Sequence, residues 1–346
     1  MSLPLHYFTT APLECLNRVL EHTPHDRTFT LMPRGCRDAL CRVMPGVSAD
    51  LEIDDAESRK DFGTLQQILS AMLDKGLTRK SLVICIGGGV TTDIGGLAAA
   101  LYMRGVRYIN IPTTLLAMVD ASSGGKTAID FGGVKNCVGA FHQPLTTIIS
   151  PCFLESLPAA QILSGWAEIL KHGVLQADTQ LFNTDPLQLS SDEWLPLIRE
   201  SVNFKQSVVD RDPQELGLRR ILNLGHTAGH AFEMLALKRG ADVTHGQAVA
   251  QGLATALILS VMKTDYPSMQ MQSVAAAIKN TFPPIPFDCK DYPQLLSLMH
   301  RDKKNQGDGL ISFTLLDAEG NPAPGTPVSD TEATEALDIT RDLLSL

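Results

Sequence analysis

Short β-rich runs alternate with helical runs through the first half of this chain. Strands are predicted at Phe29–Met32, Leu51–Ile53, Leu82–Ile86, Tyr108–Ile111 and Thr147–Ile149. Between them, Leu65–Leu73 and Ile94–Tyr102 carry apolar residues at helical spacing. Strands that alternate with helices in this way form βαβ units. The pattern therefore predicts a mainly parallel sheet of the Rossmann-like α/β class.

After about Pro151 the pattern becomes helical. Helices are predicted at Pro158–Leu175, Trp194–Val209, Gly217–Leu235, His245–Met262, Ser268–Lys279 and Thr331–Leu344. One strand, Leu310–Leu316, interrupts them, and the proline clusters at Pro283–Pro286 and Pro322–Pro327 are interpreted as loops. The chain is therefore expected to form an N-terminal Rossmann-like domain over residues 1–150 and a mostly α-helical domain over residues 151–346.

The composition argues against some classes of partner. The 346 residues are 44% hydrophobic and carry a formal net charge of −9. Nucleic acid and anionic membrane surfaces require basic faces, so neither is expected as a partner. The longest apolar stretch, Leu253–Met262, is too short to span a bilayer.

Cysteine usage and the first residues predict a cytoplasmic protein. Seven cysteines stand at irregular spacings without a Cys-x-x-Cys pair. Most have apolar neighbours, so they are interpreted as small buried side chains of a protein in a reducing compartment. The chain opens without the basic stretch and long apolar run of a signal peptide.

Three glycines, Gly87 to Gly89, follow the predicted strand Leu82–Ile86 and precede a helix. Such a turn lets backbone N–H groups approach a phosphate, and the helix N-terminus favours its negative charge. Thr92 stands where the third glycine of G-x-G-x-x-G would fall, so a tight turn without a ligand is the alternative. Gly95 and Gly96, inside the helix, would let another backbone or a cofactor lie close.

Six basic residues lie near glycine, acidic or metal-ligating motifs: Arg104, Lys126, Lys135, Lys171, Lys205 and Arg219. An acidic protein that binds an anion must gather positive charge locally, so the set predicts a phosphorylated carboxylate substrate. For each residue alone, an exposed salt bridge is the simpler interpretation. The Gly-Gly-Lys126 turn is not a Walker loop, because Asp120 occupies the position of its first glycine.

Four side chains have the character of metal ligands: Glu168, His226, His230 and His245. His226 and His230 are four residues apart and share a helix face, so both could bind a metal, or one could bind while the other transfers protons. Lys171 lies three residues after Glu168 and shares its face. A histidine hydrogen-bonded to a carbonyl is the alternative for either imidazole. Three ligands leave a coordination position open, as in catalytic zinc sites, with cobalt or iron as alternatives.

These motifs together resemble the 3-dehydroquinate synthase family of sugar phosphate cyclases. The resemblance runs from about Glu57 to Leu316 through Gly-Gly-Gly-Val-x-x-Asp93, Pro-Thr-Thr-Leu-Leu-Ala-x-Val-Asp120, Ala-Glu168-x-x-Lys171 and Asn223-x-Gly-His226-Thr-x-Gly-His230. It implies a cytoplasmic homodimer that uses NAD and one zinc ion. The implied reaction is conversion of 3-deoxy-D-arabino-heptulosonate 7-phosphate, a phosphorylated keto acid, to 3-dehydroquinate and phosphate in the shikimate pathway.

The resemblance also implies roles for individual residues. The implied zinc ligands are Glu168, His226 and His245, with His230 as the spare imidazole. The implied catalytic and substrate-binding residues are Asp120, Lys126, Asn136, Lys135, Lys171, Lys205, Arg219, Asn223, one of Lys303 and Lys304, and Arg104, which reaches the partner subunit's site. The implied NAD-binding residues are Glu57, Lys60, Gly88, Gly89, Val90, Asp93, Thr113, Thr114, Leu116, Asp120, Lys135, Ser156 and Leu157.

Three other functions remain open at this stage. Another sugar phosphate cyclase, of the inosose or valiolone type, would need fewer cationic partners, because its substrate has no carboxylate. A metal- and NAD-dependent polyol dehydrogenase would accumulate NADH. A non-catalytic binding protein would not release phosphate.

Overall fold

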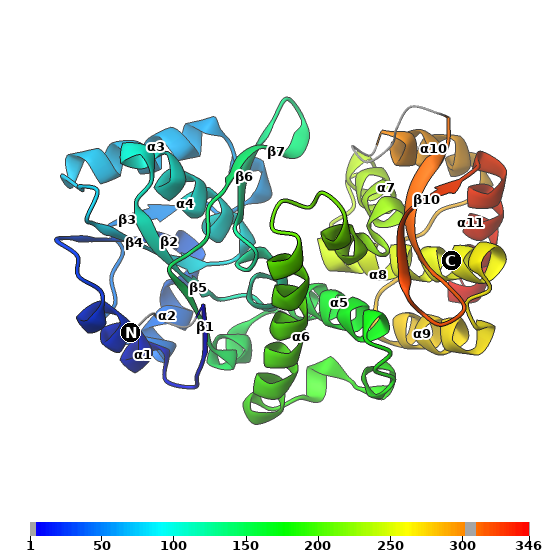
Figure 1. Ribbon diagram of the computed structural model, residues 1–346, viewed down its shortest axis with the longest axis horizontal. Coiled ribbons are helices and arrows are strands. Elements are labelled where there is room, and N and C mark those ends of the chain that lie inside the picture. The colour runs from blue at the N-terminus through cyan, green and yellow to red at the C-terminus, as the bar shows by residue number, and fades with distance from the viewer. Residues whose placement is uncertain (1–4, 302–308, 346) are drawn as a thin grey trace. The chain divides into compact units, whose positions relative to one another are not determined.

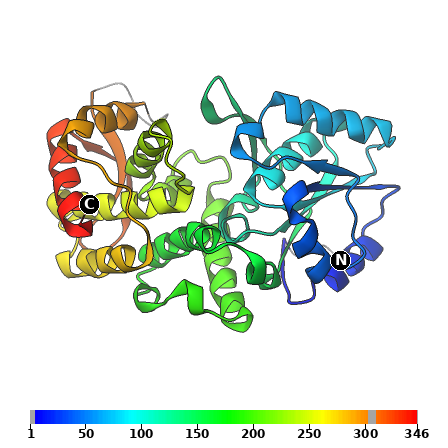
Figure 2. The same ribbon diagram turned by 180° about the vertical axis from the view of Figure 1, so that it is seen from behind.

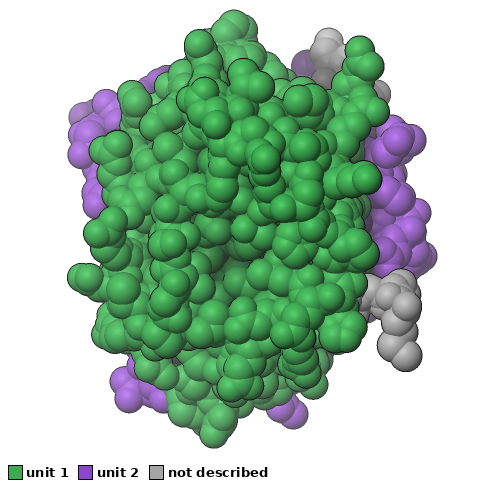
Figure 3. Space-filling model, turned by 90° about the vertical axis from the view of Figure 1, so that its left-hand side faces the viewer, with its two compact units in different colours: residues 1–158, 189–206 green, residues 159–188, 207–346 purple. Residues whose placement is uncertain are grey.

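The computed structural model describes residues 5–301 and 309–345 and divides into two compact units (Figures 1 and 3). The first unit comprises residues 1–158 and 189–206, and the second comprises residues 159–188 and 207–346. The helix α6 (Ser191–Arg211) contributes to both units, because its first part belongs to the first unit and its end to the second.

A six-stranded sheet forms the centre of the first unit. Its spatial order is β1 (His6–Phe8), β8 (Thr146–Ile149), β5 (Arg107–Pro112), β4 (Leu82–Gly87), β2 (Thr28–Pro33) and β3 (Leu51–Ile53). Every pair in this order is parallel. All six residues of β4 are buried, as expected for a parallel strand covered on both faces. The predicted fold class is confirmed.

Helices α3 (Phe62–Asp74) and α4 (Gly89–Leu101) lie together over one face of the sheet (Figures 1 and 2). Two glycines let α4 approach its neighbours closely. A Cβ on Gly95 would collide with the Cys85 thiol of β4, and a Cβ on Gly96 would lie 2.6 Å from Cγ2 of Thr127. These two glycines therefore make room for side chains of their own unit. Two further helices, α1 (Pro12–His22) and α2 (Arg37–Val43), also belong to this unit, as does the first part of α6.

An antiparallel hairpin of β6 (Lys126–Phe131) and β7 (Val134–Phe141) was not predicted. Its turn is Gly132–Gly133, and both residues have positive φ angles, +60° and +77°. Two central residues with positive φ are the requirement of a tight hairpin turn, so the Gly-Gly pair was a signal that could have revealed the hairpin.

The second unit is mostly helical. It contains α5 (Ala159–Leu175), α7 (His226–Lys238), α8 (His245–Thr264), α9 (Ser268–Thr281), α10 (Tyr292–His300) and α11 (Asp330–Leu344). A two-stranded antiparallel ribbon of β9 (Ile311–Leu316) and β10 (Pro322–Val328) packs with them. No helix in the described part of the chain is both long and apolar enough to cross a membrane.

Short 3-10 or π turns connect these elements. They are η1 (Arg34–Cys36), η2 (Glu57–Arg59), η3 (Tyr102–Arg104), η4 (Ala117–Ala121), η5 (Pro151–Ser156), η6 (Gln180–Asn183), η7 (Pro186–Gln188), η8 (Leu218–Asn223) and η9 (Cys289–Asp291).

Two predicted elements were wrong. The helix predicted over Gly217–Leu235 is divided, because Gly225 takes a left-handed φ of +81° between η8 and α7. The loop predicted over Pro322–Pro327 is the strand β10. Prolines are compatible with a strand here because β10 has a neighbour on one side only, and the register shifts between Pro324 and Thr326.

Candidate active site

Glycines bring the helices of the second unit close enough to form a cluster of ligating side chains. A Cβ on Gly252 of α8 would lie 2.7 Å from Cα of Gly229 in α7 and closer still to the Gly225 carbonyl oxygen. A Cβ on Gly246 would lie 2.5 Å from Cα of Ser164 in α5, and the Gly246 N–H donates to Oγ of Ser164 at 3.2 Å. Backbone therefore packs directly on backbone where α5, α7 and α8 meet.

The three imidazoles of the cluster converge. One ring nitrogen from each of His226, His230 and His245 lies within 4.8 Å of the other two. Nδ1 of His226 lies 3.3 Å from the Leu224 carbonyl oxygen, and Nδ1 of His245 lies 3.4 Å from Oε2 of Glu233. Both acceptors lack a proton, so they favour the tautomer in which Nδ1 carries the hydrogen and Nε2 is unprotonated.

Glu168 reaches the same cluster from α5. Its side chain is 1% exposed, and Oε1 lies 3.6 Å from Nε2 of His226. Oε2 is paired with the Lys171 ammonium, whereas Oε1 has no hydrogen-bond partner among the described residues. A buried carboxylate oxygen without a donor is costly, and a cation beside Nε2 of His226 would satisfy it.

Two candidate ligand sets differ in burial. The three imidazoles form one set. The other is the set implied by the family resemblance, Glu168 with His226 and His245, in which Glu168 contacts His226 at 3.6 Å. His230 is exposed, whereas Glu168 is buried with an unsatisfied oxygen. A cation held by the second set would satisfy the buried oxygen and would leave the exposed imidazole of His230 outside the ligand set.

Two other predicted residues of the second unit lie in η8. Arg219 is 2% exposed and donates from Nη1 to the Pro213 carbonyl oxygen at 2.9 Å. Asn223 donates from Nδ2 to Oε1 of Glu215 at 3.0 Å, and Glu215 has a left-handed φ of +58°. Glu215 was not among the predicted site residues. The predicted contacts Lys303 and Lys304 lie outside the described residues.

In the first unit, the glycine turn lies at a topological switch point of the sheet. From the adjacent strands β2 and β4 the chain continues to β3 on one side and to β5 on the other. Ligands of open α/β sheets bind outside the carboxyl ends of strands at such a point. The helix α4 begins at Gly89 there, and no described side chain caps it. Its first N–H groups therefore suit an anion.

Residues beside this turn form a buried polar network. Nζ of Lys60 donates to Oδ2 of Asp93 at 2.6 Å and to Oδ1 of Asn136 at 2.5 Å. Burial disfavours the Lys60 ammonium, but the Asp93 carboxylate outweighs this effect and raises the pKa of Lys60 above its ordinary value. Glu57 and Lys135 approach each other to 4.0 Å. The structure thus gathers these five predicted residues.

Asp120, in η4, is paired with Lys205 of α6. Nζ of Lys205 contacts the Asp120 carboxylate and also donates to its carbonyl oxygen at 2.6 Å. Lys205 is buried, which makes this pair more than a surface salt bridge.

The other predicted residues of the first unit take the following positions. Thr113, Thr114 and Leu116 follow the carboxyl end of β5, and the Thr113 N–H donates to the Gly87 carbonyl oxygen at 2.9 Å. Lys126 is exposed at the start of β6, and Arg104 is exposed with a left-handed φ of 66°. Ser156 and Leu157 lie at the end of η5.

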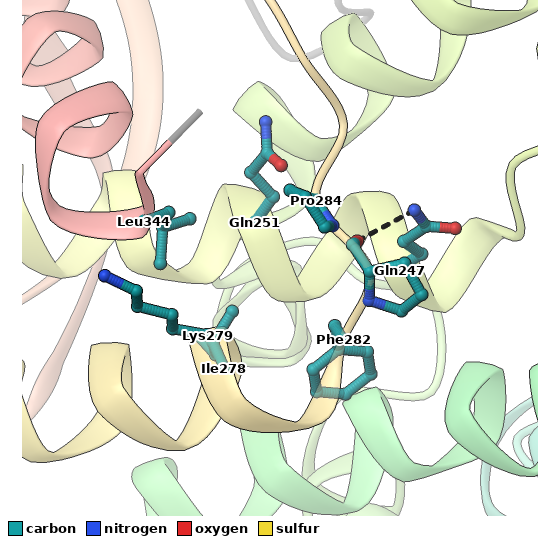
Figure 4. A pocket seen from close by; sticks show the side chains of 8 residues that line it. Gln247, Gln251, Ile278, Lys279, Phe282, Pro284 and Leu344 are labelled. Carbon is teal, nitrogen blue, oxygen red and sulfur yellow. Dashed lines mark hydrogen bonds between the residues drawn. The ribbon is translucent and has the colours of Figure 1, made fainter.

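A separate pocket of about 170 Å³ lies between α8, α9 and the end of α11 (Figure 4). Its Gln247 amide donates to the Pro283 carbonyl oxygen at 2.9 Å, and its Gln251 amide is bonded to the backbone of Ile285. Gln247 is two residues from His245, and side chains at that spacing do not share a helix face. None of the described candidate ligands lines this pocket.

Solved structures with the same architecture define the class of protein. The chain superposes on 2-epi-5-epi-valiolone synthase from Streptomyces hygroscopicus, solved with NAD+ and Zn2+, with a TM-score of 0.82 and 26% identity over 99% of this chain and 98% of that one. It superposes on 2-deoxy-scyllo-inosose synthase, solved with carbaglucose-6-phosphate, NAD+ and Co2+, with a TM-score of 0.84 and 23% identity over 97% and 96%. The fold is that of the sugar phosphate cyclases.

Sequence comparison identifies the family within this class. Family profiles for the N-terminal and C-terminal parts of 3-dehydroquinate synthase match residues 50–164 and 165–305. The 3-dehydroquinate synthase of Parabacteroides distasonis is 40% identical over 337 residues, 94% of this chain and 95% of that protein. The enzyme of Bordetella pertussis is 40% identical over 271 residues, 77% and 75%. The chain belongs to the 3-dehydroquinate synthase family.

Proposed function

We propose that this chain converts 3-deoxy-D-arabino-heptulosonate 7-phosphate to 3-dehydroquinate and phosphate, with NAD and one zinc ion. Family membership supports the reaction. The structural observation that supports it best is the buried Oε1 of Glu168, which lacks a hydrogen-bond partner among the described residues and lies 3.6 Å from Nε2 of His226.

The donor set fits zinc or cobalt. One carboxylate and two neutral imidazoles, Glu168, His226 and His245, would hold the ion and leave a coordination position for substrate. The valiolone and inosose synthases were solved with Zn2+ and Co2+ respectively, which agrees with this assignment. Bound NAD would supply reversible hydride transfer at one substrate carbon, and a zinc ion held by these side chains would supply Lewis-acid polarisation of the hydroxyl on that carbon.

The remaining side chains bind, orient and move protons. His230 is the proposed proton-transfer group, and its exposed ring lies 5.4 Å from that of His226 between centroids. Asp120, Asn136, Asn223 and the cations Arg104, Lys126, Lys135, Lys171, Lys205 and Arg219 are the proposed substrate contacts. By holding carboxylate and phosphate, they would restrict the open-chain substrate to conformers that can close the ring.

The nucleotide is proposed to bind at the glycine turn of the first unit. The first N–H groups of α4 suit its pyrophosphate, and the network of Lys60, Asp93 and Asn136 lies beside the turn. Glu57, Thr113, Thr114, Leu116, Ser156 and Leu157 complete the proposed NAD contacts. The proposed NAD contacts thus lie mainly in the predicted NAD-binding domain, residues 1–150, with Ser156 and Leu157 just beyond it, and the proposed metal ligands lie in residues 151–346.

The direct test is turnover by the purified protein. With the heptulosonate phosphate, zinc and catalytic NAD, we expect equal amounts of phosphate and 3-dehydroquinate, without accumulation of NADH. EDTA should abolish phosphate release, and zinc should restore it. Net NADH without phosphate would instead identify a dehydrogenase.

The rival cyclases are tested with a heptulose phosphate that has no carboxylate. Lys205 and Arg219 are both buried, which favours a carboxylate substrate. Lys205→Met should reduce the preference for the carboxylate substrate without changing zinc content. Lys238→Met, which alters an exposed lysine, should leave both the substrate preference and the zinc content unchanged. An unchanged preference in Lys205→Met would contradict the role of Lys205.

A cytoplasmic homodimer is also part of the proposal. All seven cysteines are free thiols, although only Cys15 and Cys85 are buried, so the predicted burial was wrong for the other five. Light scattering at micromolar concentration should give twice the monomer mass, and a monomeric mass would exclude the proposed reach of Arg104 into a partner subunit.

A further inference from the structure

Glu233 lies on the same face of α7 as two of the clustered histidines. It follows His226 by seven residues and His230 by three, so the three side chains project from one side of the helix. Its side chain is 8% exposed. No motif of the sequence analysis included it.

The Glu233 carboxylate faces an imidazole on a different helix. Its Oε2 lies 3.4 Å from Nδ1 of His245, at the N-terminus of α8. A carboxylate can only accept from Nδ1–H, so the contact retains the hydrogen on Nδ1 and presents the Nε2 lone pair to a metal. It also limits rotation of the ring and increases the basicity of Nε2.

His226 shows the same arrangement with a backbone acceptor. Its Nδ1 lies 3.3 Å from the Leu224 carbonyl oxygen, and its Nε2 lies beside Oε1 of Glu168. Each of the two imidazoles is therefore oriented by a hydrogen-bond acceptor at its Nδ1. Only the acceptor of His245 is a side chain that mutation can remove.

We propose that Glu233 is a positioning residue of the metal centre, which holds His245 in the tautomer and orientation required of a ligand. The inference rests on the proposed function, because it assumes a metal at Glu168, His226 and His245. It adds a second carboxylate that acts through His245 and does not contact the ion.

Metal affinity measures this role without turnover. Zinc affinity would be determined by competition with a chromogenic chelator for the full-length wild type, Glu233→Gln, Glu233→Ala and Glu335→Ala. Loss of an outer acceptor typically weakens metal binding about 10- to 100-fold, which is expected for Glu233→Ala. Glu233→Gln should lie between it and the wild type, because an amide oxygen still accepts from Nδ1–H without the negative charge. Glu335 is exposed on α11, and its variant should bind like the wild type.

Two further measurements separate positioning from folding. The absorption spectrum of the Co2+ form reports the ligand geometry and should change in both Glu233 variants. Melting of the metal-free proteins reports stability, and Glu233→Gln, which is nearly isosteric, remains informative if the alanine variant does not fold.

The outcomes distinguish the inference from the proposed function. If the wild type binds neither zinc nor cobalt, the metal centre itself is wrong. If the wild type binds zinc while both Glu233 variants bind it equally tightly with an unchanged cobalt spectrum, the positioning role is overturned. A lower melting temperature with unchanged affinity of the folded protein would also overturn it.

Discussion

Substitution of Gly252 by alanine tests whether glycine packing builds the metal centre. In the present structure a Cβ at this position would lie 2.7 Å from Cα of Gly229 and closer to the Gly225 carbonyl oxygen, where ordinary contact begins at 3.4 Å. Both neighbours are backbone atoms of or next to α7, so no side chain can rotate away. The helix α7 would have to withdraw from α8 by about 1 Å.

The expected energetic cost follows from two opposing effects. Overpacking in a well-packed interior costs about 1–3 kcal/mol, and the upper end applies because backbone must move. Alanine gains about 1 kcal/mol over glycine in helix propensity. The net loss in free energy of unfolding should be about 2 kcal/mol. The same movement would carry His226 and His230 away from His245, and a misplacement of about 1 Å can reduce activity about 100-fold.

Denaturant unfolding would measure the loss of stability, and zinc competition together with the rate of phosphate release would measure the damage to the site. Gly173→Ala is the matched control in α5, because its new Cβ would clash only with Cδ1 at the end of the Leu181 side chain, whereas the backbone carbonyl oxygen of Asp178 would lie at an ordinary contact distance of 3.5 Å. We expect Gly173→Ala to change stability and zinc affinity little. If Gly252→Ala unfolds at the wild-type denaturant concentration and binds zinc with wild-type affinity, the glycine contact does not set the geometry of the cluster.

Two other predictions concern the buried ion pair of Lys60 with Asp93 and the hydrogen-bonded carboxylate of Glu332. Lys60→Met leaves the Asp93 carboxylate without its ammonium partner and should cost about 3 kcal/mol of unfolding free energy. Adding Asp93→Asn to the same chain should restore most of this loss. If the losses from the two substitutions simply add in this double-mutant cycle, the two side chains are not coupled. Lys263 and Ser329 lower the pKa of Glu332 to about 2. The ionised Glu332 carboxylate therefore contributes fully to the free energy of unfolding above pH 4.5, and this contribution is lost as the pH falls towards 2. Because Glu332 is partly exposed, Glu332→Gln should cost only about 1 kcal/mol at pH 7, and the difference from wild type in unfolding free energy should disappear near pH 2. A difference that persists there would contradict the assignment.

Several features of this protein could be predicted from sequence because near neighbours in the chain determine them. The alternation of strands and helices in the first half predicted the parallel sheet, and the spacing of His226 and His230 predicted a shared helix face. The contact between Glu168 and Lys171 likewise follows from their separation of three residues on α5. Helical and strand periodicities are local properties, so local sequence was sufficient.

Other features depend on contacts between distant segments. Residues 189–206 join the first unit although they follow part of the second, and this depends on which surfaces pack together. The approach of Glu168 to His226, and of Glu233 to His245, depends on glycines that allow α5, α7 and α8 to touch through their backbones. The candidate metal ligands could be predicted from the residue types and motifs of the sequence. Only the packing of these helices determines that Oε1 of Glu168 lacks a hydrogen-bond partner among the described residues and that Glu233 contacts Nδ1 of His245. Both features depend on distances between residues far apart in the chain.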